Sequence, residues 1–232
     1  MAPSRKPTRP YRGFEQGPIR PPSEALSLLI RVTRNCPWNR CTFCPVYKHT
    51  RFSTRPIEHV LADIDAVHTG IQALRELGAD MRAPYAVSLE ALHRARPRAD
   101  KAALDAAYSW FYRGHMRAVF LQDANSLILK PPRLVSILDH LWDRFPEARR
   151  ITSYGRSETI ARLSDDEMRA LAKAGLSRIH IGLESGSDQV LARVQKGATK
   201  AQHIEAGRRV VATGISLSEY YMPGLGGVDF SQ

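Results

Sequence analysis

The sequence contains only three cysteines, and all of them lie within nine residues, at Cys36, Cys41 and Cys44. An odd number of cysteines in so short a segment does not form the disulfide framework of a small secreted domain. Thiols gathered so closely in one segment are instead typical of a metal site. This segment is therefore the first candidate for a site of chemistry.

Long apolar runs are also missing. No stretch approaches the ~20 consecutive apolar residues that a membrane-spanning helix needs, so a membrane protein is not expected. The basic start, MAPSRKPTRPYRG, is not followed by an apolar stretch that could serve as a secretory signal. We therefore expect a cytoplasmic protein.

Aromatic residues make up only 8% of the chain, and acidic residues are outnumbered, with 23 Asp and Glu against 34 Lys and Arg. The formal charge of +11 could attract phosphates. The basic residues are spread along the chain and do not alternate with aromatic residues as on a base-stacking surface. Nucleic-acid binding is therefore left open but not favoured, and a basic surface that docks an acidic electron-transfer protein is the alternative.

The composition, 43% hydrophobic, is that of a folded domain with its own core. Residues 1–25 are rich in proline and arginine and are expected to form an extended N-terminal arm. The prolines of this arm are Pro3, Pro7, Pro10, Pro18, Pro21 and Pro22. Residues 26–232 are expected to form one domain.

Short apolar segments alternate with segments of helical periodicity at intervals of roughly 30 residues, once past residue 115. The predicted strands are 28–33, 118–121, 151–154, 178–183 and 215–222. One of the intervening helices begins with a capping box at Ser164 and Glu167. Residues 79–115 are expected to hold a helix around 104–111 and a broken, Arg-rich stretch over 93–98, interpreted as an insertion or an extended first crossover.

This alternation predicts an α/β fold, a partial (βα) barrel of about five parallel strands with helices outside. A ligand site would lie at the carboxyl ends of the strands, and the cysteine loop directly follows the first strand. Three thiolates there can hold three irons of a four-iron cluster and leave the fourth iron open to a small molecule. Three structural cysteines, or a zinc site completed by His49, are the alternatives. A cluster that only carries electrons would require a fourth ligand.

Two motifs carry a resemblance to a known family. The first is Cys-Pro-Trp-Asn-Arg-Cys-Thr-Phe-Cys over 36–44, and the second is Ile-Gly-Leu-Glu-Ser-Gly-Ser-Asp over 181–188, followed by Lys196 and Gly197. With the βα repeats behind them, they resemble the radical SAM superfamily over residues from about 14 to 227. The commonest spacing of that family is three residues and then two. This chain has four and then two, a spacing that some of its subfamilies share.

The resemblance implies a [4Fe-4S] cluster held by Cys36, Cys41 and Cys44, with S-adenosylmethionine chelating its open iron. One-electron reduction would give methionine and a 5′-deoxyadenosyl radical, which abstracts hydrogen from an unknown substrate, small or macromolecular. An acidic electron donor of the flavodoxin or ferredoxin type is the partner this implies. Because no further cysteine exists, a second, auxiliary cluster within this chain is excluded. A zinc-stabilised basic binding protein, or an RNA-modifying member of the family, remains the alternative.

The resemblance also implies roles for single residues. Phe43 matches the aromatic near the adenine, although a core aromatic is an equal alternative. Asp123 lies where the family often has Gly-Gly-Glu, and would accept the methionine ammonium; the alternative is a cap on the next turn. Ser153 and Arg156 end the third strand, where a cation could meet the methionine carboxylate.

At the ends of the last two strands, Glu184 matches the residue that binds the ribose hydroxyls, with an N-cap contact to the helix near Ser187 as the alternative. Met222 falls where the fifth strand opens toward the adenine. The family core usually has six βα units and five are counted here. The chain is therefore expected to lack the C-terminal part of that core, as a truncated product or one part of a split protein.

Overall fold

The computed structural model describes residues 10–83 and 85–230. A five-stranded parallel sheet runs through its centre, with strand order β1-β4-β5-β6-β7. Its strands are β1 (Leu28–Arg31), β4 (Ala118–Gln122), β5 (Arg150–Gly155), β6 (Leu176–Glu184) and β7 (Ser216–Tyr221). Each predicted strand is present, and the parallel order confirms the predicted partial barrel of βα units.

Two very short strands, β2 (Thr33–Arg34) and β3 (Ser53–Thr54), pair antiparallel at the two ends of the cysteine loop. A two-residue pairing leaves no pattern in the sequence, and the following helix begins only after Pro56. The ladder closes the loop at its base and so fixes where the cysteines emerge from the sheet.

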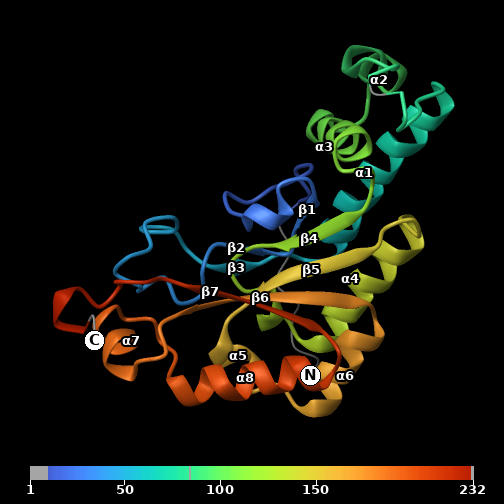
Figure 1. The fold of residues 1–232 in the computed structure, drawn as a ribbon. Helices are drawn as coiled ribbons and strands as arrows, with labels where there is room; N and C mark the ends of the chain where they lie inside the picture. The colour runs from blue at the N-terminus through green and yellow to red at the C-terminus, as the bar shows by residue number, and fades with distance from the viewer. Residues whose placement is uncertain (1–9, 84, 231–232) are drawn as a thin grey trace, which may run out of the picture.

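The helices are α1 (Ile57–Glu76), α2 (Leu89–Ala95), α3 (Lys101–Tyr112), α4 (Pro131–Arg144), α5 (Ser157–Ile160), α6 (Asp165–Lys173), α7 (Asp188–Arg193) and α8 (Lys200–Ala212). Most of them cover the convex side of the sheet, whereas α2 packs on α1 and α3, and α7 lies at the carboxyl ends of the strands (Figure 1). Three 3-10 turns complete the described elements: η1 (Pro22–Glu24), η2 (Ser126–Ile128) and η3 (Val228–Phe230). No helix within the described ranges is long and apolar enough to cross a bilayer.

The predicted helices form where apolar residues recur every three or four positions. The capping box of α6 is present as predicted: Ser164 accepts a hydrogen bond from the Glu167 backbone, and the Glu167 side chain accepts one from the Ser164 backbone. The predicted broken stretch over 93–98 is wrong in its first part, since 93–95 belong to α2. This seven-residue helix is capped by Ser88 and buries only Leu92, too few apolar positions to produce a readable period.

The core lies between the sheet and these helices, where Leu28, Ile30 and Leu121 of the strands meet Ile64 and Ile71 of α1. Side chains of this kind contribute about 1.5–3 kcal/mol each when fully buried. The interior is continuous from α1 to α8, which holds the strand ends in one rigid frame. That frame fixes the loops that follow the strands.

The N-terminal segment lies against the sheet. The first nine residues of the predicted arm are outside the described residues, and the boundary predicted after residue 25 stays a prediction. Gln122 receives a hydrogen bond from the Gly17 backbone at 2.8 Å and donates to the Ile19 carbonyl at 2.6 Å. Glu24 is completely buried. This part of the chain therefore lines the concave side of the sheet.

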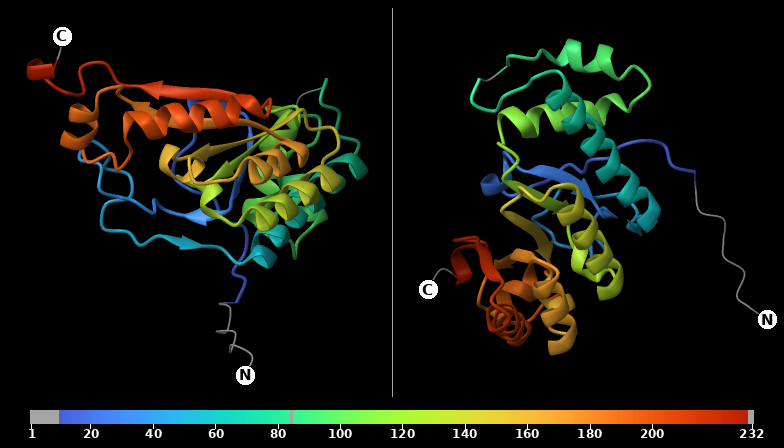
Figure 2. Two further views of the ribbon diagram at one scale, coloured as in Figure 1. Left: turned by 90° about the horizontal axis from the view of Figure 1, so that it is seen from below. Right: turned by 90° about the vertical axis from the view of Figure 1, so that its right-hand side faces the viewer.

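The carboxyl ends of the strands point to the left in Figure 1, where the cysteine loop, α7 and the segment after β7 gather. Figure 2 shows the same layers from two further directions, with the helices on one side of the sheet. Residues far apart in the sequence meet at this end of the molecule. It is the end at which the sequence predicts a ligand site.

Candidate functional site

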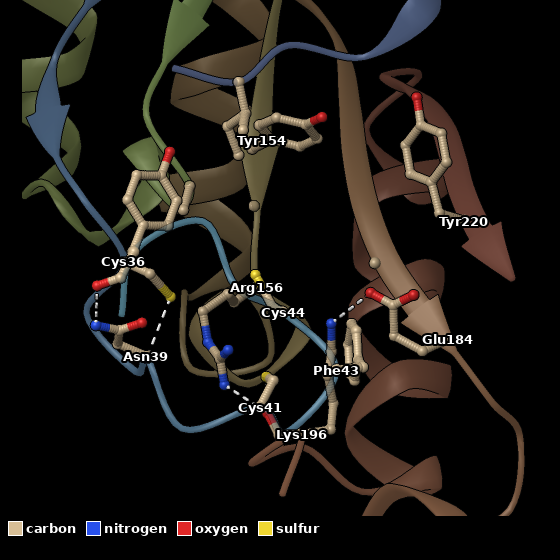
Figure 3. Close-up of a pocket in the computed structure, with 15 residues that line it drawn as sticks. Cys36, Asn39, Cys41, Phe43, Cys44, Tyr154, Arg156, Glu184, Lys196 and Tyr220 are labelled. Atoms are coloured by element: carbon tan, nitrogen blue, oxygen red, sulfur yellow. Dashed lines mark hydrogen bonds and ion pairs between the residues drawn. The ribbon is translucent and has the colours of Figure 1, made fainter. Parts of the chain in front are cut away.

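A cavity of about 240 Å³ opens at the carboxyl ends of the strands (Figure 3). Residues from the cysteine loop and from the ends of β5, β6 and β7 share its lining. They include Cys36, Cys41, Cys44, Phe43, Tyr154, Arg156, Glu184, Lys196 and Tyr220. The structure thus brings the three cysteines and three of the other six predicted site residues to one cavity.

One side of the cysteine loop is docked on the segment that follows α7. The Trp38 indole donates a hydrogen bond to the Gln195 carbonyl at 2.6 Å, and the Thr42 backbone N–H donates to the Val194 carbonyl at 3.0 Å. Gly197 has a φ of +66°, and a Cβ there would lie 2.3 Å from Trp38. Glycine at this position therefore lets the indole lie flat against the backbone.

The other side of the loop is held by Asp123, which is completely buried. Its carboxylate accepts hydrogen bonds from the Asn35 backbone at 3.0 Å, from the Arg31 guanidinium at 2.8 Å and from the Tyr47 hydroxyl. Burial, and then the hydrogen bond to Asp123, raise the pKa of Tyr47 far above its usual value. Asp123 lies behind the loop, away from the cavity lining, and its predicted role toward a methionine ammonium stays a prediction.

The three thiols are free of disulfides. Burial raises the pKa of Cys41, while the cations of Lys196 and Arg156 act in the opposite direction and the neighbouring Cys36 and Cys44 raise it further. Metal binding deprotonates thiols, because the bound cation stabilises the thiolate. A cationic centre among these thiols would therefore remove the penalty that burial imposes.

The metal alternatives differ in the ligand geometry that they require. No three Cys, His, Asp or Glu side chains of residues 10–83 and 85–230 surround a point where one ion could bind. A tetrahedral zinc holds its sulfur ligands about 2.3 Å from one centre. The thiolates of a four-iron cluster each bind a different iron and so stand farther apart. His49, the fourth ligand of the zinc alternative, is exposed and does not line the cavity.

Arg156 follows β5 and lines the cavity with its guanidinium. The group donates hydrogen bonds to the carbonyls of Lys196 at 3.0 Å and Gly197 at 3.1 Å, and it lies 5.4 Å from the centre of the Trp38 ring. Ser153, also predicted for the site, points elsewhere: it is completely buried and donates to backbone carbonyls next to it. Arg156 can therefore meet a ligand, whereas Ser153 supports the strand.

Glu184 ends β6 and forms an ion pair with Lys196, with 2.9 Å between Oε1 and Nζ and only 11% of each side chain exposed. The alternative role for Glu184, a cap on α7, is wrong. The cap of α7 is Ser187, whose hydroxyl accepts a hydrogen bond from the Val190 backbone. Met222 is 39% exposed and lies outside the cavity lining. Its backbone N–H donates to the Glu184 carbonyl at 3.0 Å.

Phe43 is half-buried and lines the cavity beside the Glu184–Lys196 pair (Figure 3). A cavity wall of this kind suits a flat apolar ligand group. Its placement agrees with the predicted contact to an adenine, which stays a prediction.

Tyr154, Tyr220 and Lys196 belong to the cavity but were not predicted as site residues. The two tyrosines lie on β5 and β7, where alternate residues face the concave side of the sheet. That period of two was the one signal that could have found them. Lys196 was part of the second quoted motif, but nothing in the motif indicated an ion pair with Glu184.

Comparison with known proteins bears on this cavity. Residues 140–232 match the family model described as the radical SAM superfamily. Among curated proteins, the chain is similar to 4′-phospho-dehydrooxetanocin synthase of Priestia megaterium, with 28% identity over 206 residues. The match covers 82% of this chain and 22% of that enzyme, so the chain spans less than a quarter of the relative.

Two solved structures share the fold. The first is the cobalamin-dependent S-adenosylmethionine radical enzyme OxsB with aqua-cobalamin and S-adenosylmethionine bound: TM-score 0.54, 23% identity, 85% of this chain and 24% of that one. The second is the radical S-adenosylmethionine methyltransferase TsrM from Kitasatospora setae with cobalamin and a [4Fe-4S] cluster bound: TM-score 0.50, 15% identity, 85% of this chain and 32% of that one. At these identities the likeness concerns the fold.

Proposed function

We propose that this chain, whose residues 140–232 match the radical SAM superfamily model, forms the part of a radical SAM enzyme that binds a [4Fe-4S] cluster and S-adenosylmethionine. The observation that carries the proposal is the set of three free thiols lining one cavity at the carboxyl ends of the strands. A cluster bound there would supply the electron for reductive cleavage of S-adenosylmethionine, and the resulting 5′-deoxyadenosyl radical would abstract hydrogen from a substrate. The protein supplies position and a partly dry cavity.

Cys36, Cys41 and Cys44 would hold three irons of the cluster. Their loop is anchored on both sides, by Asp123 and by the segment after α7, and all three cysteines line the cavity. Anchoring of this kind sets ligand positions before the metal binds, as a second layer of contacts does at other metal sites.

Arg156 and Glu184 would position S-adenosylmethionine. A guanidinium offers forked donors to a carboxylate, and here it is oriented by the Lys196 and Gly197 carbonyls. The Glu184 carboxylate can accept from ribose hydroxyls while Lys196 neutralises its charge. Phe43 would pack against the adenine. These roles make cofactor binding sensitive to each of the three side chains.

An acidic electron donor of the flavodoxin or ferredoxin type is the partner that suits the charge of the chain. Arg40 and Arg51 of the cysteine loop are exposed, and the net charge is +11. A donor with an acidic face would be attracted toward the loop and would approach the cluster closely. The substrate, small or macromolecular, is not determined by these residues.

The test is anaerobic reconstitution of the full 232-residue chain with iron and sulfide. We expect about four irons per chain, thiolate-to-iron absorption in the visible range, and an EPR signal of the reduced cluster that changes on adding S-adenosylmethionine. Cys41→Ser should lose most of the iron, because three thiolates are the minimum ligand set. His49→Ala is the matched control and should retain it. A colourless protein holding one zinc, with zinc lost in His49→Ala, would contradict the proposal.

A further inference from the structure

Three buried or half-buried side chains form a connected row on the concave side of the sheet. Glu24 Oε1 lies 3.2 Å from His180 Nε2, and His180 Nδ1 lies 3.3 Å from the Tyr220 hydroxyl. Glu24 and His180 are completely buried, whereas Tyr220 lines the cavity that also contains the three cysteines. Figure 3 places Tyr220 across the cavity from Cys36 and Cys41. The row therefore connects the buried interior with the candidate site.

Glu24 is held as a carboxylate. Burial acts to raise its pKa, but the hydrogen bonds from His180 and Ser27 and the nearby Arg150 guanidinium outweigh it, and the pKa of Glu24 lies below its usual value. Arg150 Nη2 stands 3.3 Å from Glu24 Oε2. A carboxylate offers only acceptors. His180 Nε2 must therefore carry the proton in this pair.

The tautomer of His180 then decides the direction of the other hydrogen bond. With its proton on Nε2, the neutral imidazole has only an acceptor at Nδ1. The Tyr220 hydroxyl consequently donates its proton to His180, and its oxygen retains lone pairs for a donor in the cavity. This is the orientation in which a tyrosine hydroxyl can receive one proton while releasing another.

The surroundings of His180 are mainly aromatic. Phe120 and Tyr154 lie edge-on to its ring at centroid distances of 6.1 Å, and Tyr220 lies at 6.0 Å. The titratable groups facing the imidazole are Glu24 from η1, Tyr154 from β5 and Tyr220 from β7. Burial, followed by charges including Glu184, raises the pKa of Tyr154 far above its usual value, so it stays protonated. Among the described residues, Glu24 is the charged group within hydrogen-bond distance of the imidazole.

We propose that Glu24, His180 and Tyr220 form a proton relay that accepts a proton from a hydroxyl group of the substrate bound in this cavity. The proposal rests on the proposed function. The substrate O–H bond breaks and its proton binds the Tyr220 oxygen, while the Tyr220 proton moves to His180 Nδ1. The resulting imidazolium is paired with the Glu24 carboxylate. No electron is gained or lost by these three residues, and the proton is returned by the reverse path or to water.

The charged side chains at the cavity are paired: Arg156 Nε lies 3.2 Å from Glu158 Oε2, and Lys196 Nζ lies 2.9 Å from Glu184 Oε1. A neutral hydroxyl can donate to the Tyr220 oxygen without adding a charge to this cavity. Tyr220 is thus proposed as a catalytic residue. His180 orients its hydroxyl and accepts its proton, and Glu24 stabilises the resulting imidazolium.

The experiment uses p-nitrophenol as a probe, since it carries one hydroxyl that ionises near neutral pH with a large change in absorbance. It is titrated into the full chain, purified anaerobically, at about one pH unit below the ionisation of the free probe. We expect the ionised fraction of the bound probe to rise at least threefold over the free probe. In Tyr220→Phe the fraction should fall to that of the free probe. Tyr221→Phe, an exposed neighbour, is the control and should behave as the wild type.

Nitrogen NMR of the imidazoles provides the second readout. Without probe, His180 should be neutral with its proton on Nε2; with probe, it should become imidazolium in the wild type but not in Tyr220→Phe. A purely structural network would leave His180 neutral in both. A proton on Nδ1 in the free protein, equal ionisation in wild type and Tyr220→Phe, or no binding of the probe at millimolar concentration would each overturn the relay.

Failure of the relay and failure of the proposed function are separable. Iron content and the EPR response to S-adenosylmethionine, measured on Tyr220→Phe, should match the wild type, because Tyr220 is no cluster ligand. A wild-type chain that binds no cluster would contradict the proposed function while leaving the probe and NMR results to decide the relay.

Discussion

Asp123 holds the cysteine loop in place through hydrogen bonds that its position in the sequence does not indicate. Its carboxylate joins Asn35, just before the first cysteine, with Tyr47, three residues after the last one, and with Arg31 of β1. Both ends of the cysteine loop thus depend on one buried anion. Removing a partner from a buried charged pair leaves the other charge uncompensated, which is costly in a low-dielectric interior.

Asp123→Asn should therefore destabilise the fold and loosen the loop. We expect the free energy of unfolding to fall by about 2 kcal/mol, because the charged hydrogen bonds of the carboxylate are lost while Arg31 keeps Glu15 as a counter-charge at 2.8 Å. Iron retained after reconstitution should fall as well. Anaerobic urea denaturation and iron analysis measure both. Asp139→Asn, at an exposed position of α4, is the matched control. An unchanged urea midpoint in Asp123→Asn would contradict the stabilising role of Asp123 at the cysteine loop.

Gly182 leaves space for the Glu184–Lys196 pair. A Cβ at this position would lie 2.2 Å from Glu184 Oε1 and 2.8 Å from Lys196 Nζ. Gly182→Ala should displace the pair and weaken S-adenosylmethionine binding about tenfold, which corresponds to about 1.4 kcal/mol. Equilibrium dialysis on the reconstituted chain measures the affinity. Gly186→Ala, where a Cβ meets nothing within 4 Å, should leave affinity unchanged. Equal affinities for the two variants would mean that Glu184 does not contribute to S-adenosylmethionine binding.

Among the elements, α5 and α8 are joined by a hydrogen bond between Ser157 Oγ and His203 Nδ1 at 2.6 Å. His203 is 4% exposed, and its Nε2 is buried without a protein partner. Burial first, and then the cations Lys196 and Arg156, lower the pKa of His203 to about 4. The packing of α8 thus requires a neutral imidazole, since an added proton would have no acceptor.

The free energy of unfolding should decrease as the pH falls, because His203 becomes protonated more readily in the unfolded chain. The pKa of His203 in the folded state lies below its unfolded value of 6.5, so the unfolded chain binds the extra proton first. The contribution is complete above pH 6.5 and is lost as the pH falls toward 4, at up to about 1.4 kcal/mol per pH unit and about 3 kcal/mol in total. Urea denaturation between pH 7 and 4.5 measures the slope.

His203→Asn is the comparison for this slope, because Asn does not titrate and can still bond Ser157. Other carboxylates titrate in both proteins, so the difference between the two slopes is the relevant quantity. Identical slopes for His203→Asn and the wild type would contradict the assignment.

For the whole molecule, the excess of basic residues predicts how the cluster would be reduced. Steering of an acidic donor depends on charges near the point of approach and weakens with salt. Arg40 and Arg51 are exposed on the cysteine loop, whereas Arg94 and Arg98 are exposed at the far end of the molecule, on or next to α2. The two pairs carry equal charge at different distances from the cavity.

Reversing both loop arginines, Arg40→Glu with Arg51→Glu, should slow reduction by a flavodoxin about tenfold at low salt. Reduction by dithionite, a small reductant, should change little. The control pair, Arg94→Glu with Arg98→Glu, makes the same change in net charge and should slow the flavodoxin reaction much less. Stopped-flow absorbance follows both reactions. Equal slowing by the two pairs would mean that net charge alone, and no docking at the loop, governs reduction.

The extent of what could be predicted differs between strands and short elements. The five strands were found because each is a run of apolar residues long enough to be buried, and α6 was found through its capping box. The short helix α2 and the β2–β3 ladder were missed, because a single buried side chain or a two-residue pairing leaves no period in the sequence. The cysteines, Arg156 and Glu184 were placed at the cavity because strand ends meet there.

The sequence by itself determined the alternation of strands and helices and the loop with its three thiols, since hydrophobic periodicity and ligand spacing are local properties of the chain. Only the tertiary structure decided that Glu24 meets His180, 156 residues away, and that His180 meets Tyr220. It also decided that Asp123 lies behind the cysteine loop instead of facing the cavity. Contacts of this kind depend on the curvature and register of the sheet, which no short segment of sequence encodes.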